Sequence, residues 1–134
     1  MSEFASPRAV VRRLIEAVTA RRVDALPDLY AEDAVVVHPF AMPPVPLEGR
    51  EALREHFTRN FARMEGVEFT ARNVVIHETA DPEVVITEFD YEVRVPKKDR
   101  VFVVPNIFVL RIRRGRIVES RDYAHHRAFE EGLA

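Results

Sequence analysis

His38 is the side chain in this sequence whose type and position best suit proton transfer. It ends an apolar run that begins at Ala34, and Pro39 follows it directly. The residue before a proline favours extended geometry and proline cannot donate to a strand ladder, so His38 is expected at a strand end. Residues 40–46 hold three prolines, which would stiffen the next loop into the rim of a cavity. An imidazole at such a rim is a candidate proton carrier, because it titrates near neutral pH.

Asp122 and Asn106 are the polar residues expected to share that cavity. Strand alternation places Asn106 on the uncharged face of residues 101–113. For the last strand, a face of Val118, Ser120, Asp122 and Ala124 carries one charge, whereas the opposite face carries two, so Asp122 is expected inside. The turn at residues 114–115 fits either a two-residue loop or a bulge, and a slip of one residue would turn Asp122 outward.

Under the favoured register Asp122 lies across from Asn106, with His38 at the mouth of the cavity. Burial and proximity would then let His38 and Asp122 titrate near neutrality, as general acid–base catalysis requires. We predict His38 and Asp122 as catalytic residues, with Asn106 and Ser120 as orienting donors. Asn106 could equally be a buried amide bonded to backbone. The full set of expected substrate contacts is Leu14, Phe57, Thr87, Phe89, Tyr91, Asn106, Phe108, Leu110 and Ser120.

The order of elements along the chain indicates an α+β fold. Ser6-Pro7 is typical of a helix start, a short helix is expected within residues 23–30, and Gly49 precedes a third helix that ends near residue 64. A strand over 33–38 lies between the last two. From residue 67 the pattern changes to alternation, which predicts four strands in a meander up to residue 126. The expected architecture is a single domain over 1–134, a cone-shaped, curved antiparallel sheet packed on three N-terminal helices.

Composition excludes several classes of partner. The 134 residues hold 20 basic and 22 acidic side chains, so no general attraction to nucleic acid or to an anionic membrane is expected. No cysteine is present, and adjacent strand residues such as His125 and His126 point to opposite faces, so no metal site is expected. The N-terminus lacks an apolar signal region and no apolar run reaches membrane-spanning length, which favours a cytoplasmic protein.

Three segments carry a resemblance to a known family: RRLIEAV, the stretch from VDALPDLY through HPFAMPPVPLEGREALREHF, and FVLRIRRGRIVESRDY. They resemble the SnoaL-like and ketosteroid isomerase-like group, which shares the cone-shaped fold of nuclear transport factor 2. The stretch from ETADPEVVITEF through GRIVESRDY is also similar to the cofactor-free A/B proteins of phenazine biosynthesis. By this resemblance His38 stands where the isomerases keep an aspartate base, and Asp122 is comparable to the acidic residue of SnoaL-type cyclases. Leu14 and Phe108 replace the isomerases' oxyanion-hole tyrosine and protonated aspartic acid, which implies that the chain is not a true steroid isomerase.

The resemblance implies a cofactor-independent enzyme that isomerises, cyclises or dehydrates a mainly apolar organic molecule, such as a polyketide-like compound. The alternative is a non-catalytic small-molecule binding domain, because one fold serves unrelated tasks. Ile86, Val103, Ile107 and Val109 form an apolar patch on the outer sheet face, which indicates a homodimer. A third hypothesis is that this outer face makes the chain an assembly module.

Overall fold

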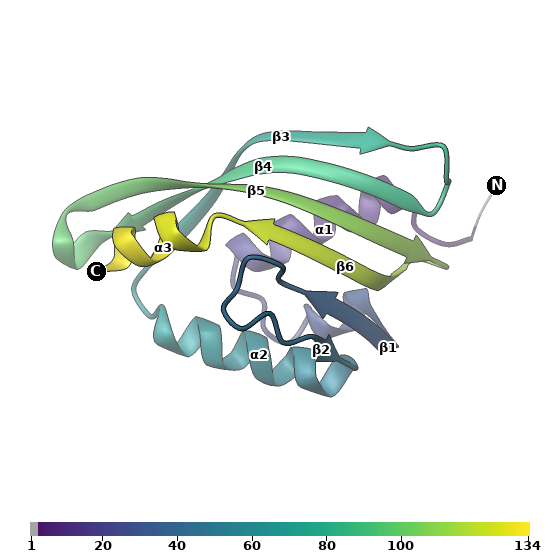
Figure 1. Cartoon of the computed structure of the whole chain (residues 1–134), viewed down its shortest axis with the longest axis horizontal. Coiled ribbons are helices and arrows are strands. Elements are labelled where there is room, and N and C mark those ends of the chain that lie inside the picture. The colour runs from purple at the N-terminus through teal and green to yellow at the C-terminus, as the bar shows by residue number, and fades with distance from the viewer. Residues whose placement is uncertain (1–2) are drawn as a thin grey trace.

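The computed structural model describes residues 3–134 and shows a curved sheet with helices against its inner face (Figure 1). The helices are α1 (Pro7–Thr19), α2 (Arg50–Arg63) and α3 (His126–Leu133), with 3-10 turns η1 (Pro27–Leu29) and η2 (Pro96–Lys98). The strands are β1 (Tyr30–Val37), β2 (Leu47–Glu48), β3 (Glu68–Glu78), β4 (Val84–Val95), β5 (Arg100–Arg113) and β6 (Arg116–Ala124). Within residues 3–134 the sheet order is β2-β1-β6-β5-β4-β3, and it does not close into a barrel. The expected α+β cone is confirmed.

Three details differ from the sequence-based expectation. The sheet is mixed, because β1 pairs with β6 in parallel while the other neighbours are antiparallel. The short helix expected within residues 23–30 is only the 3-10 turn η1, so two α-helices precede the meander. The third helix is instead α3 at the C-terminal end, where His125 caps the helix by accepting a hydrogen bond from the Ala128 amide.

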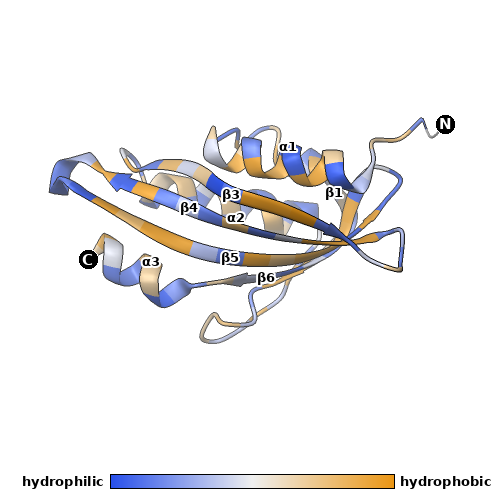
Figure 2. Cartoon of the chain, turned by 90° about the horizontal axis from the view of Figure 1, so that it is seen from above, coloured by the Kyte–Doolittle hydropathy of each residue, from blue (hydrophilic) through white to orange (hydrophobic). Residues whose placement is uncertain are grey.

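Helix α1 lies along one side of the sheet (Figure 2). It starts where the sequence predicts, because the Ser6 hydroxyl accepts from the Ala9 amide at 3.2 Å and Pro7 occupies the first turn. Its apolar stripe is buried, with Val10 and Val11 fully enclosed. Across the core lie Val85 and Leu110 on the inner face of β4 and β5. This packing leaves a cavity between the helices and the sheet.

The register of β6 decides which side chains enter the cone. Arg111 pairs with Glu119 but Ile112 pairs with Ile117, so Val118 is an extra residue in a bulge. Ile117 is therefore the buried residue at this point, and the prediction that Val118 faces inward is wrong. Beyond the bulge, Ser120 and Asp122 are buried as predicted.

Cross-strand neighbours on β5 and β6 also differ from the expected pairs. Asp122 lies opposite Phe108, and Asn106 lies opposite Ala124. Asp122 and Asn106 are thus diagonal neighbours on the inner face, not directly across from each other. Diagonal neighbours still face the same space, so both can contact one ligand.

Helix α3 lies beside β5, near the β4–β5 hairpin (Figure 1). Phe129 and Leu133 pack on a second apolar cluster that contains Val93, Val95 and Val104. The hairpin holds the end of the helix through charged donors. Lys98 Nζ donates to the Leu133 carbonyl at 2.6 Å, and Arg100 Nη1 donates to the carbonyls of Gly132 and Ala134 at 2.8 and 2.7 Å.

Among residues 3–134, none of the helices has the length and apolar character that a membrane crossing requires.

Candidate functional site

A cavity of about 410 Å³ lies inside the cone, bounded by the helices and the inner face of the sheet. Its wall is mostly apolar, with Leu14, Phe57, Phe61 and Phe108 among the lining residues. The polar lining groups come from helices α2 and α3, from the sheet, and from His38 and His125 next to strand ends. They are Tyr30, His38, His56, Asn60, Arg63, Tyr91, Asn106, Asp122, His125, His126 and Glu130. Such a volume and lining suit a small organic molecule with a large apolar part.

His38 and Asp122 meet in this cavity, with 3.7 Å between His38 Nε2 and Asp122 Oδ2. The parallel pairing of β1 with β6 explains their proximity. Val36 pairs with Ser120 and Val37 with Arg121, so His38, the next residue along the chain, lies beside Asp122. The side chains are 20% and 11% exposed, so both are largely shielded from water. The distance exceeds hydrogen-bond length, which leaves room for a shared contact with a ligand.

Burial strongly favours the protonated form of Asp122. It raises the pKa of this carboxyl to about 7, although the Ser120 hydroxyl, which donates to Oδ1, lowers it. Tyr30 and Tyr91 lie near enough that burial and the Asp122 charge together raise the pKa of both phenols. Both phenols therefore keep their protons over the whole physiological range.

Burial acts on His38 in the opposite direction. It is the largest cause that lowers the pKa of the His38 imidazole to about 4, and the neighbouring His56 and His126 lower it further. His38 and Asp122 lie within ion-pair distance, yet burial favours the neutral form of each. Between about pH 4 and pH 7 the site thus holds a protonated acid and an unprotonated base side by side.

Asn106 is buried on the inner face of β5 and lines the cavity. Its Nδ2 donates to the Val104 carbonyl at 3.0 Å. The backbone therefore orients the carboxamide. The sequence left open whether Asn106 contacts the substrate or is a buried amide bonded to backbone, and the structure shows the bond to backbone.

The expected substrate contacts fall into two groups. Leu14, Phe57, Tyr91, Asn106 and Phe108 line the cavity. The remaining four are enclosed in the protein and do not line it: Thr87, Phe89, Leu110 and Ser120.

Each of these four has an internal partner that accounts for its burial. The Thr87 hydroxyl donates to the Val75 carbonyl at 3.1 Å, and the Phe89 ring makes a T-shaped contact with Phe108 at 5.0 Å. Leu110 belongs to the main apolar core. Ser120 bonds to Asp122 and so acts on the cavity through that carboxyl.

Two cavity histidines, His56 and His126, were not predicted from the sequence. Ring centroids are 5.3 Å apart for His38 and His56, and 6.1 Å apart for His38 and His126. His56 lies one residue before Phe57 in α2, and its Nε2 is 3.0 Å from Asn60 Nδ2. His56 could have been predicted to lie in the cavity, because it lies beside the apolar stripe of α2. The pair His125 and His126 was expected on a strand with only one of them facing the site, and this was wrong: α3 begins at His126 and both residues line the cavity.

These imidazoles do not form a metal centre. In the described part of the chain, no three His, Asp or Glu side chains are arranged to hold a metal ion.

Residues 11–120 match the model of the SnoaL-like domain, which is most of the chain. The chain belongs to the SnoaL-like domain family. No match was found among curated proteins.

Solved structures share the fold along nearly the full length of the chain. A "Putative Isomerase" from Bacillus subtilis is 24% identical, with 99% of this chain and 96% of that chain covered and a TM-score of 0.85. A "putative SnoaL-like polyketide cyclase" from Shewanella putrefaciens is 14% identical, with 98% of each chain covered and a TM-score of 0.73. A protein from Catenulispora acidiphila with a ketosteroid isomerase-like fold, in complex with trimethylamine, is 22% identical. That match covers 89% of this chain and 86% of that chain, with a TM-score of 0.70. At these identities the similarity concerns the fold.

Proposed function

We propose that this protein is a cofactor-independent enzyme that moves protons on a mainly apolar small molecule, with residues 1–134 acting as one domain. The observation that carries the proposal is the pair His38 and Asp122, 3.7 Å apart in an apolar cavity. Burial makes one a neutral base and the other a protonated acid at the same pH. Pairs of groups whose environments separate their pKa values mark acid and base roles.

The chemistry that fits this pair is enolisation of a carbonyl compound. His38 Nε2 accepts a proton from the carbon next to the carbonyl, and the C–H electron pair forms the new carbon–carbon double bond. Asp122 gives its proton to the carbonyl oxygen, so the enol forms without a buried enolate charge. If the substrate has a carbon–carbon double bond conjugated with the enol, His38 returns its proton to the far carbon of that bond, the enol hydroxyl returns its proton to Asp122 as the carbonyl reforms, and an isomerisation is complete. In a cyclisation the enol carbon attacks a second carbonyl, whose oxygen takes the proton from His38 while the enol hydroxyl returns its proton to Asp122. Both residues then regain their starting protonation states.

Other lining residues support binding more than chemistry. Leu14 and Phe108 give part of the cavity wall an apolar character, and Asn106 offers a polar contact near Asp122. With apolar residues at these two positions, we assign the proton donor for the carbonyl oxygen to Asp122, which lies beside the base His38. This composition favours SnoaL-like cyclase or isomerase chemistry over steroid isomerisation.

The proposal is tested with 1-tetralone, a bicyclic ketone whose hydrogens next to the carbonyl exchange through the enol. Exchange in deuterated buffer is followed by proton NMR with the wild-type protein, His38→Ala and Asp122→Asn. Loss of either group is expected to lower catalysed exchange by about 10²- to 10⁴-fold, the usual contribution of general acid–base catalysis. Folding is verified for each variant by circular dichroism. Wild-type exchange that equals the buffer rate, or unchanged exchange in both variants, would overturn the proposal.

The pH dependence of the same reaction gives a second test. Exchange should fall below about pH 4, where His38 becomes protonated, and above about pH 7, where Asp122 loses its proton. In Asp122→Asn the alkaline decline should disappear. Exchange that instead rises through pH 7 and stays high would assign the base role to the Asp122 carboxylate and contradict the proposed roles of both residues.

A non-catalytic binding domain is the second candidate function, and the mostly apolar wall of the cavity favours it. Convergence of His38, Asp122 and Asn106 on one cavity favours catalysis instead. Binding of 1-tetralone without accelerated exchange would decide for the binding function.

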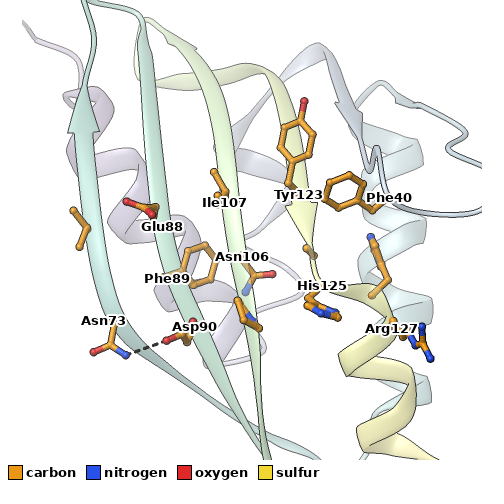
Figure 3. A pocket seen from close by; sticks show the side chains of 14 residues that line it. Phe40, Asn73, Glu88, Phe89, Asp90, Asn106, Ile107, Tyr123, His125 and Arg127 are labelled. Atoms are coloured by element: carbon orange, nitrogen blue, oxygen red, sulfur yellow. Dashed lines mark hydrogen bonds between the residues drawn. The ribbon is translucent and has the colours of Figure 1, made fainter.

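We also propose that the outer sheet face pairs with a second copy of the chain. A hollow of about 690 Å³ lies on this face, and Figure 3 shows Ile107 on its floor with Tyr123 and Phe40 beside each other at one side. The rings of Phe40 and Tyr123 make a T-shaped contact at 5.4 Å. Val75 and Ile107 are 48% and 45% exposed and line the same hollow, and contiguous exposed apolar surface is typical of interaction sites.

Charge on this face is self-complementary. Glu88 and Asp90 lie on one side of the hollow and Arg127 on the other (Figure 3). A two-fold axis through the hollow would bring the acidic side of one copy to the basic side of the next. Ile107→Asp is therefore expected to convert a dimer to a monomer in light-scattering chromatography. Val45→Asp, at a position that is 66% exposed on the β1–β2 loop, is the control that should remain dimeric. A wild-type monomer would refute this interface.

A further inference from the structure

Three histidines from three separate elements surround one end of the cavity. His38 follows β1, His56 belongs to α2 and His126 is the first residue of α3. The His38 ring lies 5.3 Å from the ring of His56 and 6.1 Å from that of His126, and all three line the cavity. Imidazoles at this spacing repel one another once they are charged. The cluster is therefore stable when neutral, or when an anion lies among the rings.

His126 contributes a polar atom that has no protein partner. Its Nε2 is the one side-chain nitrogen or oxygen within residues 3–134 that is buried without a hydrogen bond. Most buried polar side-chain atoms in proteins are paired, so an unpaired one on a residue that lines a cavity makes that residue a candidate for ligand contact. By contrast, the neighbouring His125 uses its Nδ1 to accept from the Ala128 amide. The cap holds the start of α3 and with it the position of His126.

Below about pH 7, charged basic groups outnumber charged acidic groups around this cluster. Arg59 and Arg63 belong to α2, and Arg63 lines the cavity. Burial lowers the pKa of the His56 imidazole, and the nearby Arg59 charge lowers it further. On the acidic side, Glu130 of α3 lines the cavity. The other acid is Asp122, which is uncharged below about pH 7. The field at the cluster thus favours a negative group.

We propose that His38, His56 and His126 form a receptor for a carboxylate, and that the substrate is an organic acid with an apolar body. The inference rests on the proposed function, because it takes the same cavity as the substrate site. The apolar body would occupy the part lined by Leu14 and Phe108, while the carboxylate would accept hydrogen bonds from the imidazoles. An anion beside His38 favours its protonated form, so the bound acid would make His38 a stronger base than in the empty site.

The test compares two inert probes of nearly the same shape, 2-naphthoate and its neutral analogue 2-naphthamide. Binding is measured by titration calorimetry at about pH 6.5, close to the ordinary imidazole pKa. The wild-type protein is expected to bind naphthoate about tenfold or more tightly than the amide, as expected for one hydrogen bond to a charged group. Repeating the titration in buffers of different ionisation enthalpy should show proton uptake with naphthoate and none with the amide, because an anion favours charged imidazoles.

His126→Leu tests the contribution of the carboxylate receptor independently of the apolar part of the cavity. This variant should lose most of the preference for naphthoate and keep its affinity for the amide. His126→Gln places an amide near the position of Nε2 and should keep part of the preference for naphthoate. The control is His77→Asn, because His77 is exposed and paired with Glu88 outside the cavity at 2.6 Å.

Two results would overturn the carboxylate site: equal wild-type affinity for the two probes, or an unchanged preference in a folded His126→Leu protein. If His126→Leu does not fold, the wild-type comparison and His126→Gln still decide the question. Neither probe reacts, so these outcomes are independent of turnover. Failure of 1-tetralone exchange would refute the acid–base function alone, and equal probe binding would refute the carboxylate receptor alone.

Discussion

Asp122 and His38 should give the protein opposing contributions to the pH dependence of its stability. Burial raises the pKa of Asp122 from 3.8 to about 7, so the folded state binds its proton more tightly than the unfolded state. Stability from this group is therefore lost as pH rises from about 4 to about 7, by about 4 kcal/mol in total. Burial lowers the pKa of His38 from 6.5 to about 4, so the unfolded state binds that proton more tightly. Stability from His38 is lost as pH falls from about 6.5 to about 4, by about 3 kcal/mol.

The two contributions nearly cancel in the wild-type protein and should separate in single variants. Urea unfolding at about pH 4.5 and about pH 7.5 measures the free energy of unfolding of each protein. Relative to wild type, Asp122→Asn should gain about 3 kcal/mol between the lower and the higher pH. His38→Gln should lose a similar amount, about 2 to 3 kcal/mol, over the same interval. Asp24→Asn replaces an exposed carboxylate and is the control. Its free energy of unfolding should change between the two pH values as much as that of wild type.

The assigned protonation states would be refuted if the unfolding free energies of the two variants changed with pH in the opposite directions. If His38 and Asp122 formed a charged ion pair in the folded protein, the pKa of the histidine would be raised and that of the aspartic acid lowered. Asp122→Asn would then lose stability relative to wild type as the pH rises. Two variants that both remain parallel to wild type would show that neither group is perturbed by folding.

Two further predictions concern packing. A Cβ at Gly132 would overlap the Phe102 ring, so Gly132→Ala should displace the end of α3 and destabilise the protein by about 1 to 3 kcal/mol in urea unfolding. Glu131→Ala, on the exposed side of the same helix, should change stability by less than about 1 kcal/mol, and equal effects would contradict the packing argument. Thr87→Val should cost about 1 kcal/mol, because it removes the hydrogen bond to the Val75 carbonyl. Since Thr87 does not line the cavity, 1-tetralone exchange should be unaffected, and a loss of exchange would show that Thr87 contacts the ligand.

The alternation of apolar and polar residues in the sequence was sufficient to predict most of the sheet. Alternation along β4 and β5 predicts their inner faces, and Phe89, Asn106 and Phe108 are buried as expected. The bulge at Val118 could not be predicted, because either turn geometry at residues 114–115 fits the sequence and only pairing with β5 selects one. Charge still indicated the correct face for Asp122, since the alternative face would have buried two charges.

Helix α3 shows the limit of reasoning from local pattern. Residues up to 126 continue an apparent strand, yet the chain turns into a helix there because Phe129 and Leu133 can pack against Phe102 and its neighbours. The carbonyls at the end of the helix are then satisfied by Lys98 and Arg100. Tertiary contacts with the hairpin therefore override the weak local signal in this short segment.

By itself the sequence determined the helix start at Ser6, the faces of the long strands and an acid and a base that could share a cavity. These features depend on side-chain periodicity and on capping residues, which act over a few positions in the chain. Only the tertiary structure decided that His38 lies 3.7 Å from Asp122, because the parallel pairing of β1 with β6 joins segments far apart in sequence. It also decided that His56 and His126 complete the cluster, since helix packing positions them and no local spacing records that packing.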